Sequence, residues 1–138
     1  MKNLLIVAML FAALGAISGA EPKQARPTGR DIATAYFEAL MKGDIEGVNA
    51  LVAAPFSFDR KQVLQTKEEV EKKHQEVVEM KGKRKVPEYT VSIPANAPEL
   101  DRKVFPKYDV FRITIAGDDE HIDIYVRKDS PKVIGVSD

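Results

Sequence analysis

The sequence offers few side chains for acid–base, nucleophilic or metal chemistry, because it contains two histidines and no cysteine. Without cysteine there is no thiolate nucleophile, no disulfide and no cysteine-built zinc site. His74 falls on the apolar side of an expected helix, where a neutral imidazole could line a pocket as an acid, a base or a ligand donor, or could fill the core. His121 and Asp123 share the polar face of an expected strand, with no third ligand evident. We therefore predict no metal site.

Two charged runs are candidate binding segments. Residues 117–120, Gly-Asp-Asp-Glu, lack the spaced oxygen ligands of a calcium loop, so we interpret them as part of a hairpin turn. Residues 81–85, Lys-Gly-Lys-Arg-Lys, are interpreted as a solvated loop after a helix, with an anion or an acidic partner as the alternative. The sequence has no Ser-His-Asp signature, phosphate loop or coiled-coil heptad, and we expect no cofactor.

The overall composition is that of one folded domain. The chain has 138 residues, of which 44% are hydrophobic and 30% charged, and this length is too short for two ordinary domains. Its 21 basic residues balance 21 acidic ones, so the formal net charge is zero. This balance removes the broad positive field that nucleic acid or anionic lipid needs, and we expect no nucleic-acid partner.

The amino end has the pattern of a secretory signal peptide. Lys2 precedes an uncharged apolar run over residues 4–17, and small residues fill positions 18–20. We predict cleavage after Ala20 and export to the periplasm or the extracellular space, with no stable membrane anchor afterwards. An uncleaved anchor is the alternative, although a spanning helix needs about 20 apolar residues. Losing Lys2 leaves 20 basic against 21 acidic residues, a formal charge of −1. The predicted segments are a signal peptide over 1–20, a flexible lead-in over 21–28 and one domain over 29–138.

Three amphipathic helices are expected in the first half of the domain. Thr28 and Thr66 each stand three residues before an acidic residue, the spacing of a capping box. Gly43 supplies a left-handed stop for the first helix, and Gly82 closes the third. Val52 is expected on the apolar stripe of the second helix. The expected helices span residues 29–42, Asp44 to Pro55, and 66 to about 80.

The second half of the domain changes to the two-residue period of strands. The expected segments are a strand over 56–58, a turn over 59–61, a strand from 87 to Ile93, a hairpin of 108–116 with 120–128, and a last strand over 132–136. A dry face is formed by Phe111, Ile113, Ile115, Ile122, Ile124 and Val126. The opposite, wet face carries Arg112, Thr114, His121, Asp123, Tyr125 and Arg127. Helices first and antiparallel strands afterwards predict an α+β domain with three helices on the dry face.

Residues 36–51, Tyr-Phe-Glu-Ala-Leu-Met-Lys-Gly-Asp-Ile-Glu-Gly-Val-Asn-Ala-Leu, resemble the opening of the nuclear-transport-factor-two-like superfamily, which includes SnoaL-like cyclases and ketosteroid isomerases. In that family a helix ending in Gly-Asp is followed by a second helix, a short strand, a third helix and a curved antiparallel sheet. The resemblance implies a cone-shaped barrel with a pocket at its open end, but not a reaction. The expected pocket residues are Tyr36, Phe56, Phe58, His74, Phe111 and Ile113.

The resemblance also implies an incomplete catalytic set. Tyr36 falls where the helix-one tyrosine of ketosteroid isomerases falls, as a pocket donor or as an aromatic at the rim of the core. The catalytic aspartate position falls on Arg60, with Asp59 one residue earlier in an expected turn. No second acid lies on the dry face, so we assign no catalytic residue.

Three functions follow as hypotheses. The first is an exported, non-catalytic domain that binds a small apolar molecule or serves as an accessory module. The second is a lyase, isomerase or cyclase that uses Tyr36, His74 or Asp59 in the pocket, and it is favoured if Asp59 and His74 share one pocket. The third is an interaction or homodimer module anchored by Arg112, Tyr125 and Arg127 on the polar sheet face.

Overall fold

The computed structural model describes residues 28–117 and 120–138. The expected signal peptide, nearly all of the lead-in and two residues of the expected turn at 117–119 therefore lie outside the described residues. No helix in the described part of the chain combines the length and the apolar character that a membrane span requires.

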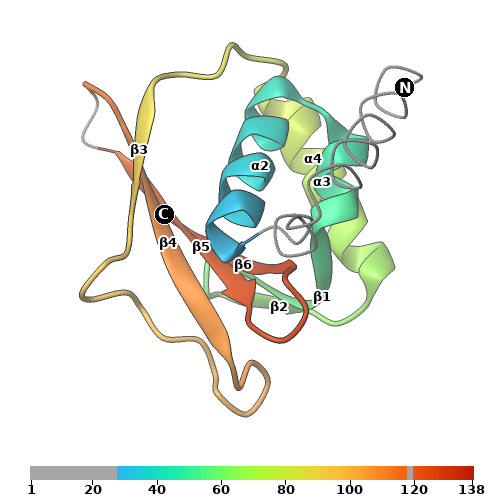
Figure 1. Ribbon diagram of the computed structural model, residues 1–138. Coiled ribbons are helices and arrows are strands. Elements are labelled where there is room, and N and C mark those ends of the chain that lie inside the picture. Colours follow the sequence, from blue (N-terminus) through green and yellow to red (C-terminus); the bar gives the residue numbers. More distant parts are fainter. Residues whose placement is uncertain (1–27, 118–119) are drawn as a thin grey trace, which may run out of the picture.

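The described residues form three helices packed on one six-stranded sheet (Figure 1). The helices are α2 (Gly29–Lys42), α3 (Ile45–Leu51) and α4 (Lys67–Lys81). The strands are β1 (Val52–Phe58), β2 (Gln62–Leu64), β3 (Tyr89–Ser92), β4 (Tyr108–Ile115), β5 (His121–Arg127) and β6 (Val133–Ser137). Their order is β2-β1-β6-β5-β4-β3, with β1 and β6 parallel and the other pairs antiparallel. The expected α+β class, with a mainly antiparallel sheet, is confirmed.

The helix ends follow their local signals. Thr28 and Thr66 each form a complete capping box, accepting from the third helical N–H while the acidic side chain there accepts from the cap N–H. Gly43 ends α2 with a φ of 73°, and Gly82 ends α4. Asp44 then caps α3 by accepting from the N–H of Gly47 at 3.0 Å. The expected helix boundaries are thus confirmed to within a residue, except at the end of α3.

The end of the second helix was predicted wrongly, because Pro55 does not terminate it. The helix stops at Leu51, and Val52 already begins β1. Pro55 sits inside that strand, after a cis peptide bond from Ala54. The pairing of β1 with β6 changes register between Val52 and Ser57, so the proline falls where the ladder is interrupted and no regular N–H bond is needed.

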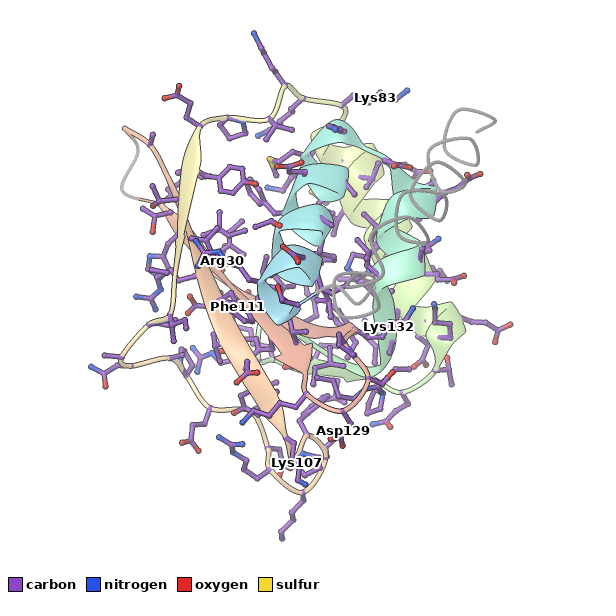
Figure 2. All side chains as sticks on the ribbon, viewed as in Figure 1. Arg30, Lys83, Lys107, Phe111, Asp129 and Lys132 are labelled. Carbon is purple, nitrogen blue, oxygen red and sulfur yellow. The ribbon has the colours of Figure 1, made fainter. Side chains whose placement is uncertain are left out.

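The dry face of the sheet was predicted correctly. Phe111, Ile113, Ile124 and Val126 are buried against the helices in one hydrophobic core. Figure 2 shows Phe111 beside the start of α2, where a side chain on Gly29 would meet its ring. The core therefore joins β4 and β5 to the first turn of α2. The expected strand from 87 to Ile93 is shorter in the structure: β3 spans Tyr89–Ser92, and Ile93 is 74% exposed.

The opposite sheet face is only in part the wet surface that was expected. Arg112, Thr114, His121 and Arg127 are partly exposed, but the connection from 93 to 107 folds over Tyr125. Leu100 and Phe105 from this connection form a second hydrophobic cluster with Tyr108, Tyr125 and Ile134. The Tyr125 hydroxyl donates to the carbonyl of Pro98 at 2.6 Å. The alternation of side chains along β5 could not predict that Tyr125 is covered, since the covering apolar side chains lie far away in the sequence.

Candidate functional site

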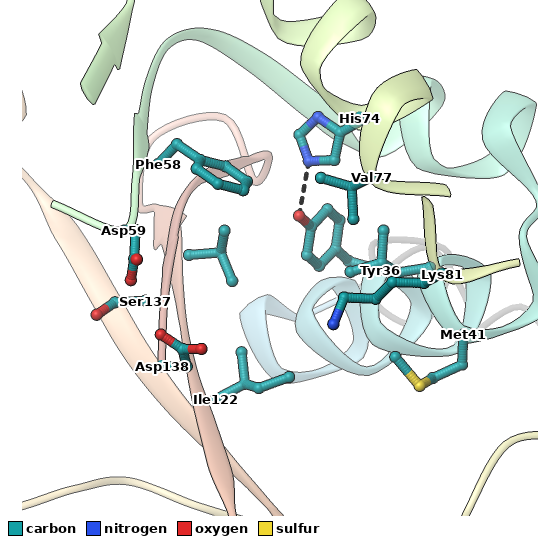
Figure 3. Close-up of a pocket in the computed structure, with 12 residues that line it drawn as sticks. Tyr36, Met41, Phe58, Asp59, His74, Val77, Lys81, Ile122, Ser137 and Asp138 are labelled. Carbon is teal, nitrogen blue, oxygen red and sulfur yellow. Dashed lines mark hydrogen bonds between the residues drawn. The ribbon is translucent and has the colours of Figure 1, made fainter. Parts of the chain in front are cut away.

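A pocket of about 160 Å³ opens between the carboxyl-terminal halves of α2 and α4 and the ends of β1 and β6 (Figure 3). Its apolar wall consists of Leu40, Met41, Phe58, Val77, Ile122 and Val136. Its polar side chains are Tyr36, Asp59, His74, Lys81, Ser137 and Asp138. Each helix contributes residues one turn apart, because positions three and four apart face the same side. The pocket is therefore apolar in the main, with a few polar groups of different kinds.

A buried hydrogen bond joins two of these polar groups, Tyr36 and His74. The Tyr36 oxygen lies 2.7 Å from His74 Nε2, and each residue is 1% exposed. On the other side of the ring, His74 Nδ1 lies 2.8 Å from the carbonyl oxygen of Val70. A carbonyl oxygen only accepts, so Nδ1 carries a hydrogen and donates it. In the neutral ring Nε2 is then a bare acceptor, and the Tyr36 hydroxyl donates to it.

Burial keeps both partners uncharged. It lowers the pKa of the His74 imidazole, an effect that the hydrogen bond to Val70 offsets only in part. Burial also raises the pKa of the Tyr36 phenol far above its ordinary value. The ring of Phe56 packs edge-on against the imidazole with centroids 5.0 Å apart and adds to its desolvation. The pair is thus a neutral donor and acceptor near neutral pH.

Asp59 reaches the pocket from a tight turn at the end of β1. Asp59 and Arg60 have φ values of 58° and 61°, and the Asp59 N–H donates to the Val136 carbonyl at 2.7 Å. The expected turn at 59–61 is confirmed. Left-handed backbone there ends the strand alternation, so the face on which Asp59 lies does not follow from the alternation of β1.

The six expected pocket residues divide into two groups. Tyr36, Phe58 and His74 line the pocket together, and Phe58 also lies under the ammonium of Lys73 at 4.9 Å. The other three, Phe56, Phe111 and Ile113, belong to the core and do not line it. Phe56 lies behind His74, while the other two sit on the central part of β4.

Several residues that line the pocket were not predicted from the sequence. Ile122 was placed on the correct face of β5, but periodicity does not say which residues of a dry face border a cavity. Val136 and Ser137 come from the last strand, whose parallel pairing with β1 brings it beside Phe58. The signal available for them was weak, since parallel pairing of distant strands leaves no local pattern.

The other residues that the sequence offered as sites, on the polar face of the sheet, are engaged within the fold. Arg112 and Asp123 form a bidentate ion pair at 2.7 and 3.0 Å, with the carboxylate buried. Tyr125 is fully buried under the 93–107 connection, so it cannot act as the exposed anchor of an interface. Within residues 28–117 and 120–138, no three His, Cys, Asp or Glu side chains gather as they would around a metal ion.

No family model and no curated protein matches the chain. Among solved structures, it is similar to an NTF2-like protein of unknown function from Cytophaga hutchinsonii ATCC 33406, with 10% identity, a TM-score of 0.42 and coverage of 81% of this chain and 88% of that chain. It is also similar to a hypothetical protein with a ketosteroid isomerase-like fold from Catenulispora acidiphila DSM 44928, in complex with trimethylamine. There the identity is 13%, the TM-score 0.38 and the coverage 78% of this chain and 82% of that chain. Likeness at this level assigns neither a ligand nor an activity to this chain.

Proposed function

We propose that this chain is an exported domain of the nuclear-transport-factor-two-like type that binds a small, mainly apolar molecule without transforming it. The observation that carries the proposal is the pocket between α2, α4 and the strand ends, whose walls are mostly aliphatic and aromatic. Pockets of this kind, with a few polar groups that orient the ligand, are typical binding sites. The helix, Gly43-Asp44 and helix arrangement supports the family, and the pattern of residues 1–20 supports export.

The size of the pocket limits what it can hold. Its volume of about 160 Å³ is close to that of an engineered apolar cavity that accepts benzene, roughly 150 Å³. Sites for drug-sized ligands are larger, about 300–1,000 Å³. The occupant is thus a molecule with a body of about one six-membered ring, or one ring of a longer ligand that extends into solvent.

An enzyme is the second candidate, because Asp59 and His74 do line the same pocket. Asp59 carries a carboxylate that could act as a base by itself, whereas His74 could do so only by taking a proton through the Tyr36 oxygen at Nε2 and forming an imidazolium. Burial disfavours that charge, and Nδ1 faces the carbonyl of Val70, which stabilises an imidazolium less than a carboxylate does. The hydrogen of Tyr36 is also engaged, so it does not point at a developing oxyanion. These features support binding over turnover.

A pair of tryptophan variants on α4 tests the proposal. Val77→Trp fills the pocket, whereas Met80→Trp adds the same side chain at a position that is 82% exposed and outside the pocket. Cyclohexanol, a six-membered ring with one polar group, serves as the probe in a titration followed by ¹H–¹⁵N spectra. We expect saturable binding to the unmodified protein and to Met80→Trp, and none to Val77→Trp. No binding to the unmodified protein, or equal binding to both variants, contradicts the proposal.

A further inference from the structure

We infer that the pocket prefers apolar molecules that carry an O–H or N–H donor over molecules of the same shape that can only accept a hydrogen bond. This inference rests on the proposed binding function and adds the chemical class of the ligand. It follows from the direction of the hydrogen bonds around Tyr36 and from the nature of the other polar groups in the pocket.

The direction of the hydrogen bonds is set at Val70. Its carbonyl oxygen takes the hydrogen of His74 Nδ1 at 2.8 Å, which leaves Nε2 as an acceptor. The Tyr36 hydroxyl gives its single hydrogen to Nε2 at 2.7 Å. A phenol has one hydrogen and two lone pairs, so what its oxygen has left to offer a ligand is a lone pair. Figure 3 shows this oxygen between the imidazole and the side of the pocket formed by Phe58.

The alternative arrangement, in which Tyr36 donates into the pocket, requires a charged imidazole. Nε2 would then need its own hydrogen while Nδ1 keeps the one bound to Val70, and burial of the ring opposes this state. A ligand carbonyl facing Tyr36 would therefore place two acceptors against each other. An unpaired buried acceptor costs more than a modest hydrogen bond returns, which is how binding sites reject analogues that lack a donor.

The other polar groups point the same way. Asp59 and Asp138 carry carboxylates that only accept, and Figure 3 shows both on the strand side of the pocket. The Ser137 hydroxyl can donate or accept. Lys81 donates, but it is exposed, as Asp138 is, so water competes for the hydrogen bonds of both side chains. The polar groups of the pocket thus match a ligand that donates.

Cyclohexanol and cyclohexanone test the inference, because they share a ring and differ in whether the oxygen carries a hydrogen. We expect cyclohexanol to bind the unmodified protein roughly fivefold more tightly, the factor that one net hydrogen bond supplies. Tyr36→Phe combined with His74→Leu removes the phenol oxygen without freeing the Nε2 acceptor behind it, so this double variant should narrow the difference between the two dissociation constants. Tyr89→Phe loses a phenol hydroxyl that donates to Glu38 outside the pocket, so it should keep the difference.

The outcomes distinguish a failure of the donor preference from a failure of the proposed binding function. Cyclohexanone binding as tightly as cyclohexanol to the unmodified protein overturns the donor preference while leaving the binding function intact. Binding of neither compound overturns the binding function, and the donor preference with it. The comparison on the unmodified protein decides the matter even if the double variant is too unstable to titrate. An undiminished preference in a folded double variant contradicts the assignment of the contact to Tyr36.

Discussion

The hydroxyl of Tyr36 should stabilise the fold, because it donates to a nitrogen of His74 that is buried with it. Tyr36→Phe keeps the aromatic ring and removes the hydrogen bond of 2.7 Å to Nε2. Both residues are 1% exposed, so the nitrogen is left with little access to water. A buried acceptor without a partner costs about 1–3 kcal/mol. For a domain of about 100 residues, each kcal/mol lowers Tm by about 4–8 °C.

Urea unfolding followed by circular dichroism measures this loss, and a cycle with His74→Leu isolates the pair. In the protein with both substitutions the unsatisfied nitrogen is gone, so the combined loss should fall short of the sum of the single losses by about 1 kcal/mol or more. The slope of unfolding against urea should stay constant, because the exposed surface hardly changes. A Tyr36→Phe protein as stable as the unmodified one, or losses that simply add, would refute the reasoning.

Three further predictions concern other parts of the fold. The free energy of unfolding should fall as the pH drops below about 6.5, by up to about 1.4 kcal/mol per pH unit, because the unfolded chain then binds a proton at His74 that the folded protein does not bind. His74→Gln should flatten this slope in urea titrations at pH 7, 6 and 5. An unchanged slope contradicts this prediction. Gly43→Ala should cost about 1 kcal/mol in the same assay, since its φ of 73° strains any other residue, and no loss would argue against the left-handed stop. Tyr125→Phe should speed amide hydrogen exchange of residues 94–105 but not of α2, because the hydrogen bond to the Pro98 carbonyl is lost. Equal exchange rates of residues 94–105 in the variant and the unmodified protein would show that this hydrogen bond does not hold the segment in place.

The helices were predictable because their signals are local. The capping boxes at Thr28 and Thr66 and the glycine stops at Gly43 and Gly82 each involve residues a few positions apart. The end of α3 was not predictable, because a proline such as Pro55 is compatible with two different local structures. It can stop a helix or occupy an interrupted strand, and only the pairing of β1 with β6 decides between them.

The site was predictable only in part, since its contacts join distant segments. His74 was placed on the apolar side of its helix, but nothing local indicated that its partner is Tyr36, 38 residues away. The burial of Tyr125 was missed for the same reason: alternation along β5 marks it as outward-facing, while Leu100 and Phe105 come from the 93–107 connection to cover it. Periodicity identifies faces, and tertiary packing decides which faces meet water.

The most direct test of the account is a ¹H–¹⁵N titration of the folded domain with cyclohexanol, with each shift assigned to its residue. The account predicts saturable shifts concentrated on the pocket residues of α2, α4 and the strand ends, with the largest changes near Tyr36, Val77 and Val136. Shifts that rise without saturation, or that lie mainly on the 93–107 connection and the sheet face beneath it, would contradict it.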